Sequence, residues 1–399
     1  MTGVRIVLID DKPAFVEKMA QSVRSAALSA GVRTEFFKIA ESDSEPAGRK
    51  MNATLTGLLK ELSQLRQGES ERKDLTENLE TAHLVFVDYD LRGTALEEGL
   101  ITGERVAQLI RQFMSAGPVV SVDRREMRFF DLIHRRPSGT NADFMLHWED
   151  LAVRSLWGGQ PRAYDPWYWP NLVETGTNYQ KRVKFVSSNY TDPVARSLGV
   201  PEDVEAILPG EDPRLELDFR EASFAKVAEA SIPPKESKAV MDDCRHRVAA
   251  SAVGVWLQSG VLPPQDILID APHLVRHCPG LLRGKPIASN LAKLTAKRAG
   301  AAVPLDPEKL KRHRFRHEFW LDRPAWWLSG ILQDRGIKDI AEPWNKKPLA
   351  VEFAEDASRF HRPSDLAPYE SEGFFATRYV RGSKTFSGIQ YSPSSRLAT

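Results

Sequence analysis

Three aspartates, Asp10, Asp11 and Asp88, are the residues of this chain whose types and positions best fit a chemical site. Asp10 and Asp11 directly follow the apolar run from Val4 to Ile9, and Asp88 directly follows the apolar run from Leu84 to Val87. Carboxylates held close together raise one another's pKa unless a cation compensates them. Because oxygen ligands suit a hard cation, these residues predict a Mg²⁺ site in which Asp88 also serves as a nucleophile.

The elements that position these aspartates are expected to form a doubly wound α/β fold. Apolar runs of strand length alternate with segments of helical periodicity up to about residue 150, which is the pattern of a parallel sheet covered by helices. Such a sheet collects the carboxyl ends of its strands at one edge, where ligands bind. The expected strands are 4–9, 34–39, 84–87, 118–122 and 144–146, and the expected helices are 13–30, 55–65 and 103–113.

The two acidic runs resemble those of the receiver domain of two-component response regulators. Val7-Leu8-Ile9-Asp10-Asp11 is similar to the acidic pair after the first receiver strand, and residues 85–93 (Val-Phe-Val-Asp-Tyr-Asp-Leu-Arg-Gly) are similar to the phospho-acceptor strand and its turn. The resemblance covers about residues 4–155 and implies a five-stranded, receiver/flavodoxin-like parallel sheet. It also implies that Asp88 accepts a phosphoryl group from a histidine kinase or phosphotransfer protein. In such a domain Asp10, Asp11, Asp88 and the main-chain carbonyl of Asp90 hold Mg²⁺.

Unusual residues occupy the positions at which a receiver contacts the phosphoryl group. A receiver carries Ser or Thr at the end of its fourth strand. Here Ser121 lies inside that strand, and counting from Pro118 puts Asp123 at its end. A receiver also carries Lys on its fifth strand, where this chain has His147, which is charged only when protonated. Ser121, Asp123 and His147 are therefore the predicted switch residues, and a degenerate receiver that only docks a protein partner is an alternative. A further alternative is that Asp10 and Asp11 simply cap the next helix.

The chain is expected to divide into three parts. Residues 1–155 form the receiver-like domain with a charged insert near 41–80, residues 156–233 form an irregular connector rich in Pro and aromatic residues, and residues 234–399 form a mainly α-helical output domain. Helical periodicity in the last part predicts helices over 236–259, 286–299, 307–319 and 324–335. The predicted function is that of a response-regulator-like signalling protein. By association, such fusions suggest a bacterial stress or phage-defence system.

Arg312 and His317 carry an alternative prediction, which is an enzyme. Their R-x4-H spacing within a basic run resembles the motif of HEPN-type ribonucleases. In those enzymes an Arg and a His on one helix act on an RNA phosphodiester, usually across a homodimer. The same spacing also arises by chance on a solvated basic helix face.

Composition limits the expected partners and location. The 55 Lys and Arg residues balance 54 Asp and Glu residues, and this formal net charge of +1 does not indicate binding of nucleic acid through bulk charge. The two cysteines, Cys244 and Cys278, form no C-x-x-C pair, which fits a reducing cytoplasm. No run approaches the length of about 18 apolar residues that a membrane span needs, so we expect a cytoplasmic protein without a membrane partner.

Overall fold

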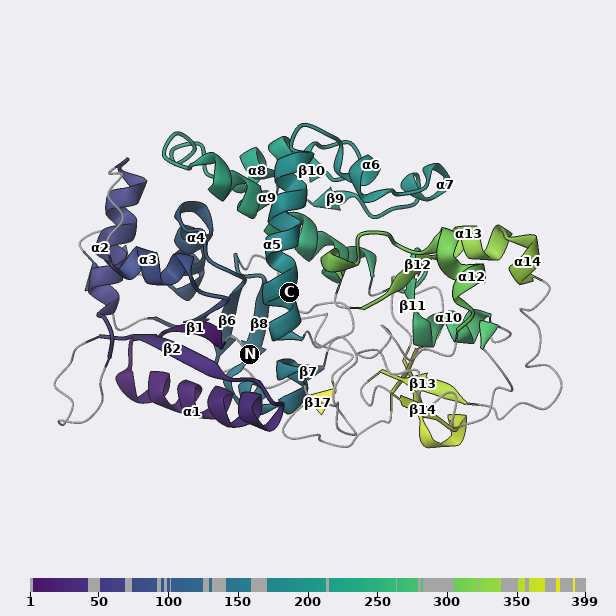
Figure 1. Cartoon of the computed structure of the whole chain (residues 1–399), viewed down its shortest axis with the longest axis horizontal. Coiled ribbons are helices and arrows are strands. Elements are labelled where there is room, and N and C mark those ends of the chain that lie inside the picture. The colour runs from purple at the N-terminus through teal and green to yellow at the C-terminus, as the bar shows by residue number, and fades with distance from the viewer. Residues whose placement is uncertain are drawn as a thin grey trace.

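The computed structural model describes most of the chain and is shown in Figure 1. The described residues are 3–41, 51–68, 74–91, 95–96, 99–100, 102–124, 129–130, 141–158, 171–212, 215–262, 264–278, 281–282, 305–321, 323–338, 351–355, 359–369, 378–380 and 390–391. The predicted helix over 286–299 and the aromatic cluster near residues 164–170 therefore lie outside the described residues.

A five-stranded, fully parallel sheet forms the N-terminal part of the structure. Its strands are, in spatial order, β2 (Thr34–Ile39), β1 (Val4–Ile9), β3 (Leu84–Asp88), β6 (Val119–Asp123) and β8 (Phe144–His147). Parallel neighbours need crossover connections, and helices supply them here. Because helices cover both faces, β3 is buried along its whole length, which explains its unbroken apolar run. The predicted doubly wound sheet is confirmed, and its predicted strands and helices agree with the structure to within one residue at each end.

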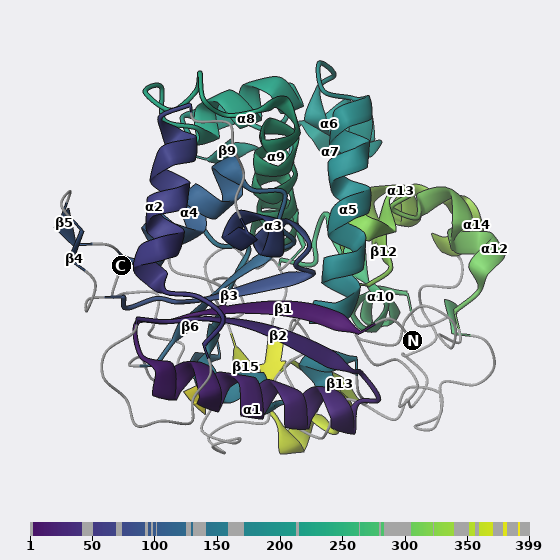
Figure 2. The same cartoon turned by 60° about the vertical axis from the view of Figure 1, so that its left-hand side comes forward.

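Helices lie on both faces of this sheet. Helix α1 covers one face, and α2, α3 and α4 cover the other (Figures 1 and 2). Their bounds are α1 (Pro13–Ser29), α2 (Leu55–Arg66), α3 (Asp74–Glu80) and α4 (Gly103–Phe113). Pro13 fits the first turn of α1 because that position needs no N–H group. Thr102 caps α4, since its side chain accepts a hydrogen bond from the N–H of Arg105.

A helix from much later in the chain packs on the α2 and α4 side. Helix α9 (Asp242–Trp256) lies beside α4 (Figure 2), and Cys244 and Val248 join the same apolar core as Val106 of α4. Glu236 connects these elements further. It pairs with Nε of Arg66 at 3.0 Å and with Nη2 of Arg105 at 2.6 Å. The sheet and the later helices therefore share one continuous core.

The region after residue 158 is mainly helical, although helices were predicted only from residue 234 on and the elements differ from the expected ones. The segment expected to be an irregular connector contains α5, a helix of 17 residues that Asn171 caps through the N–H of Glu174. The helix predicted over 307–319 is wrong, because its helical part ends at residue 313 and Arg314 forms a bridge with Trp326. The helices of this region are α5 (Leu172–Ser188), α6 (Val194–Leu198), α7 (Glu202–Glu205), α8 (Phe224–Ser231), α9, α10 (Ala271–His277), α12 (Pro307–Leu310), α13 (Leu328–Gln333) and α14 (Arg335–Lys338).

Short strands, which the sequence did not predict, add small sheets to this region. The largest has the order β14-β13-β16-β15, and β12 begins the segment that was expected to be a helix over 324–335. The remaining strands are β4 (Ala95–Leu96), β5 (Gly99–Leu100), β7 (Phe129–Phe130), β9 (Glu211–Asp212), β10 (Leu217–Asp218), β11 (Leu268–Asp270), β12 (Ala325–Trp327), β13 (Glu352–Ala354), β14 (Arg359–His361), β15 (Ala367–Tyr369), β16 (Arg378–Val380) and β17 (Gln390–Tyr391). Strands of two or three residues are too short to show an alternating pattern.

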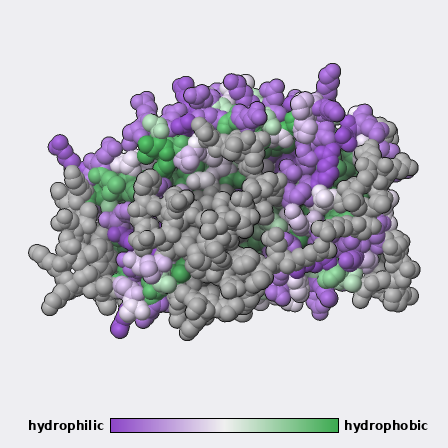
Figure 3. Space-filling view, turned by 180° about the vertical axis from the view of Figure 1, so that it is seen from behind, coloured by the Kyte–Doolittle hydropathy of each residue, from purple (hydrophilic) through white to green (hydrophobic). Residues whose placement is uncertain are grey.

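On the face of the molecule seen in Figure 3, few of the described apolar side chains reach the surface. In the view of Figure 3, hydrophilic side chains predominate among those described, and apolar ones show in small areas between them. In the described part of the chain, none of the helices has the length and apolar character that a membrane span requires.

Candidate acidic site

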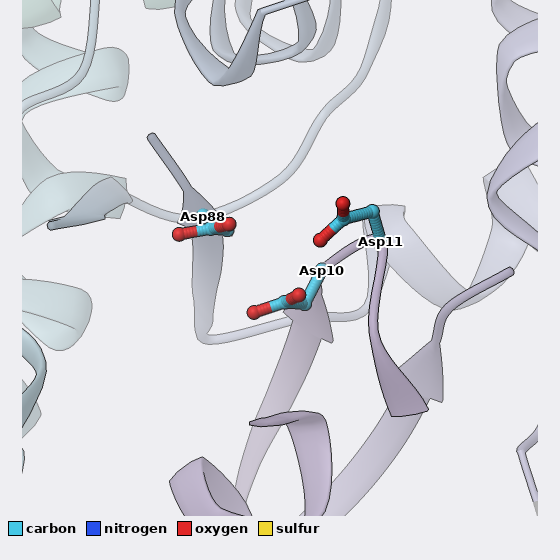
Figure 4. Close-up of side chains that lie close together, drawn as sticks. All are labelled: Asp10, Asp11 and Asp88. Atoms are coloured by element: carbon cyan, nitrogen blue, oxygen red, sulfur yellow. The ribbon is translucent and has the colours of Figure 1, made fainter. Parts of the chain in front are cut away.

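The three predicted aspartates meet at the carboxyl edge of the sheet. The register pairs Ile9 with Val87, so the next residues, Asp10 and Asp88, lie side by side where β1 and β3 end. Asp11 follows in the turn before α1. Figure 4 shows the three carboxylates around a common space. One oxygen of each lies within 4.8 Å of the others. Among the described residues, no other three His, Cys, Asp or Glu side chains place their ligand atoms this close together. We call this group the acidic pocket.

The pocket is buried and keeps unused acceptor oxygens. Asp10 and Asp88 are each 1% exposed. Oδ1 of Asp10 accepts a hydrogen bond from the N–H of Lys12 at 2.8 Å, whereas Oδ2 of Asp10 and Oδ1 of Asp11 accept none. Helix α1 has no side-chain cap, so the alternative that these residues serve as its N-cap loses support. Buried oxygens without a donor are costly, and a cation would compensate them.

Two carboxyl groups of the pocket have raised pKa values, because they are buried close to other negative charges. Burial and, after it, the charge of Asp88 raise the pKa of Asp10 to about 8. Burial also raises the pKa of Asp88 to about 6, although Arg124 acts in the opposite direction. These shifts follow from the cost of placing several carboxylates away from water. Near neutral pH the three carboxyl groups are therefore not all ionised unless further positive charge enters the pocket.

Among the described residues, Arg124 supplies the positive charge beside the three carboxylates, and the sequence did not point to it. Its Nε donates to Oδ1 of Asp88 at 3.2 Å, and its Nη2 donates to Oδ2 of the same residue. Nη2 also lies 3.6 Å from Oδ1 of Asp10 and 3.8 Å from Oδ1 of Asp11. One signal could have identified it: Arg124 directly follows β6, whose carboxyl end neighbours that of β3.

The start of α4 contacts the backbone that carries Asp88. A Cβ atom at Gly103 would lie 1.9 Å from the carbonyl oxygen of Asp88, so only glycine allows this approach. The N–H of Gly103 donates to the carbonyl of Tyr89 at 3.1 Å. The N–H of Asp90 donates to the carboxylate of Asp88. Asp90 itself lies in the turn after β3, beside the pocket and not among its three clustered carboxylates.

The predicted switch residues lie around the pocket in different ways. Ser121 is level with Val87 in the register, and alternation along the strands puts its side chain on the opposite face from that of Asp88, which argues against a phosphate contact. Asp123 is buried at the end of β6 and pairs in register with His147 at the end of β8. Nδ1 of His147 accepts from the N–H of Glu149 at 3.4 Å and so caps the 3₁₀ helix Trp148–Ala152.

Arg312 and His317 do not share a helix. Arg312 lies in a 3₁₀ turn with its side chain 73% exposed and 3.3 Å from Asp334. The ring of His317 instead packs on Phe185, with 4.6 Å between ring centroids. Burial lowers the pKa of His317, which favours a neutral ring. The HEPN-type alternative therefore loses the single helix face on which it depended.

A second group of buried charges lies outside the pocket, in the C-terminal part of the chain. Nδ1 of His273 is 2.5 Å from Oδ1 of Asp270, and its Nε2 is 2.8 Å from Oε1 of Glu355. Two arginines complete the group: Nε of Arg378 donates to Glu355, and Nη1 of Arg323 lies 3.8 Å from Asp270. Burial alone would lower the pKa of His273, but the two carboxylates outweigh it and raise that pKa. We call these five residues the C-terminal charge cluster.

Comparison with known proteins assigns no family to the chain. A scan against models of protein families and a search of the curated proteins both found no match. The chemistry of the acidic pocket therefore rests on its own geometry.

Proposed function

We propose that the chain is a receiver-type signalling protein in which Asp88 accepts a phosphoryl group. One observation carries this proposal: three buried carboxylates converge at the carboxyl edge of a parallel sheet, and among the described residues one arginine pairs with them. This edge is where ligands of open α/β sheets bind. A concentration of uncompensated carboxylates in such a place costs stability, and a ligand-binding role accounts for it better than a structural one.

The donor set fits Mg²⁺. All three residues offer oxygen, and Asp10 and Asp11 each have a buried oxygen that accepts no hydrogen bond. Asp10, Asp11 and Asp88 would hold the ion together with the main-chain carbonyl of Asp90, and waters would complete its shell. When bound, the ion would neutralise charge on the incoming phosphoryl group.

The chain's own residues supply the nucleophile and part of its surroundings. A carboxylate oxygen of Asp88 attacks phosphorus, the bond from phosphorus to the donor's imidazole nitrogen breaks, and that nitrogen keeps the electron pair. Asp88 must be ionised to attack, and its pKa of about 6 leaves it mostly ionised above neutral pH. The amino end of α4 lies against this strand end, and the N-terminus of a helix favours negative charge.

The helical region after the sheet is the proposed output. The first residue of α4 lies against the carbonyl of Asp88, and α4 packs on α9. A change at Asp88 would therefore reach the later helical region through one helix, α4. The proposed upstream partner is a histidine kinase or phosphotransfer protein. Hydrogen exchange with and without beryllofluoride tests the coupling, because α9 should change its protection and α14, which lies far from α4, should not.

A docking module without phosphorylation is the second candidate. Arg124 favours it, because this residue already engages both carboxylate oxygens of Asp88. In this case the sheet would serve as a rigid surface for a protein partner, and no phosphoryl group would enter the pocket.

Incubation with Mg²⁺ and acetyl phosphate, followed by intact-mass measurement, separates the two candidates. The wild type should gain one phosphoryl group, and Asp88→Asn should gain none. Asp150→Asn is the matched control, because it removes a buried carboxylate from the 3₁₀ helix after β8, outside the pocket. A wild type that stays unmodified supports the docking module, and a gain that persists in Asp88→Asn puts the acceptor elsewhere.

A further inference from the structure

Arg124 lies at the centre of the acidic pocket. Its Nη2 donates to Asp88 and is within 3.8 Å of an oxygen of each of the other two aspartates. A metal ion bound to all three carboxylates must lie among the same oxygens. The guanidinium group therefore occupies the space that such an ion needs.

The position of Arg124 is well defined by its contacts. Its guanidinium carbon lies 4.0 Å from the centroid of the Phe15 ring, at the start of α1. This is the geometry of a cation–π interaction, which adds to the two hydrogen bonds with Asp88. The side chain is 15% exposed. Among the described residues, no other Lys or Arg forms an ion pair with the three carboxylates.

We infer that Arg124 is the resident cation of the acidic pocket and that it competes with a divalent metal ion for the three carboxylates. This inference rests on the proposed metal-binding role of the pocket and deepens it. With Arg124 in place the three carboxylates are only partly neutralised, yet the space among them is taken. Metal binding therefore requires the guanidinium to leave Asp88.

The exchange has a structural consequence at the end of β6. Arg124 directly follows this strand, so its departure from Asp88 moves a charged side chain at the carboxyl edge of the sheet. The displaced guanidinium keeps its five donors and becomes a bidentate partner for an anionic group entering the pocket. Occupancy of the pocket is thus converted into a movement of the residue after β6.

Metal titrations of matched variants test the competition. Mn²⁺ binding is followed by the electron paramagnetic resonance of the free ion in wild type, Arg124→Gln and Arg24→Gln. Arg24 is the control because it also lies over a phenylalanine ring, that of Phe36 at 5.2 Å, but it is on α1 outside the pocket. Removing the guanidinium that competes for these carboxylates should tighten Mn²⁺ binding at least roughly tenfold. Arg24→Gln should bind as wild type does, and equal or weaker binding by Arg124→Gln overturns the inference.

A measurement on the wild type guards against misfolding of the variant. Lys12 and Lys18 also lie over the Phe15 ring, at 5.8 and 5.0 Å, but Arg124 is nearer at 4.0 Å. The ring loses this nearest cation when Arg124 leaves, so saturation with Mg²⁺ should shift its proton resonances. Ring resonances that stay unchanged in metal-saturated protein overturn the inference, whatever the variants do.

The inference and the proposed function can fail separately. Tighter Mn²⁺ binding by Arg124→Gln in a protein that acetyl phosphate does not modify supports the competition and removes Asp88 as acceptor. If Asp88 is phosphorylated and Arg124→Gln binds Mn²⁺ as wild type does, the acceptor role of Asp88 is supported and the competition is overturned.

Discussion

The acidic pocket and the C-terminal charge cluster are both buried, but their carboxyl groups shift in opposite directions. Burial alone raises the pKa of every carboxyl group in both places. In the pocket that effect prevails, and the pKa values of Asp10 and Asp88 are raised. In the cluster, His273 and the arginines outweigh it, and the pKa values of Asp270 and Glu355 are lowered. The balance of nearby charges, more than depth, decides which buried carboxylate is ready for a ligand.

The two sites therefore have different roles in the fold. The cluster links residues that are far apart in sequence, and in it His273 and two arginines face two carboxylates. Both sites have carboxylate oxygens that accept no hydrogen bond, but among the described residues the three carboxylates of the pocket face a single arginine. Removal of a carboxylate should accordingly destabilise the cluster and stabilise the metal-free pocket.

The largest effect is expected for Glu355→Gln. This change leaves His273 and Arg378 buried without a carboxylate that both now contact, and breaking a buried ion pair in this way costs about 3–5 kcal/mol. Chemical denaturation measures the free energy of unfolding. Glu352→Gln, three residues earlier and partly exposed in its pair with Arg276, is the control and should lose less than about 1 kcal/mol. Equal losses in the two variants would remove the distinction between cluster and surface pair.

Mg²⁺ should have the next largest effect, and it should depend on pH. The raised pKa values of about 8 and about 6 mean that the folded state binds more protons than the unfolded state between about pH 4 and pH 8. Stability in EDTA should therefore fall as pH rises through this window. A free Mg²⁺ concentration that is 100 times the Kd at pH 8 should add about 2.7 kcal/mol to the free energy of unfolding at that pH. The same concentration should add less at pH 6, because protons compete with the ion.

Thermal melts at the two pH values check this prediction. Asp11→Ala lacks one of the three ligands and should show a much smaller rise of the midpoint with Mg²⁺. An equal rise in wild type and Asp11→Ala would place the stabilising ion outside the pocket.

A smaller effect of opposite sign to that of Glu355→Gln is expected for Asp88→Asn. In EDTA at pH 8 this variant should be more stable than wild type by about 1 kcal/mol, because one of three clustered anions is gone while Arg124 still faces Asp10 and Asp11. Urea denaturation with excess EDTA measures the difference. A less stable variant would show that the pair of Asp88 with Arg124 outweighs the repulsion, and the two sites would then behave alike.

The smallest effect expected is the raised pKa of His273, which an NMR titration of its ring would show. The carboxylates raise its pKa, so its stabilising contribution is complete below its ordinary pKa of about 6.5 and is lost only as pH rises through the higher folded value. Its imidazole signals in NMR should stay those of the protonated ring at pH 7. His277, on the same helix, is the internal control, because burial and, after it, Arg276 lower its pKa. A neutral His273 at pH 7 would contradict the charge balance of the cluster.

The sequence predicts the sheet and the three aspartates well, for a local reason. These aspartates lie at the end of an apolar strand or within two residues after it, and a parallel sheet brings such positions together without further information. Arg124 was missed because its contact with Asp88 depends on the path of the side chain after β6. The charge cluster was missed because Asp270 and Glu355 meet only through tertiary packing. The helix expected over 307–319 failed because pairing of Arg314 with Trp326 overrides local periodicity.

The packing of α9 on α4 has a consequence for the nascent chain. All five strands of the N-terminal sheet have been synthesised once His147 has left the ribosome, but the apolar cover of α2 and α4 ends only with Val248. At about 5–20 residues per second, this interval lasts roughly 5–20 s. During that time a nearly complete sheet presents an apolar flank to the cell. A chaperone that binds exposed apolar helices would find its substrate in this interval.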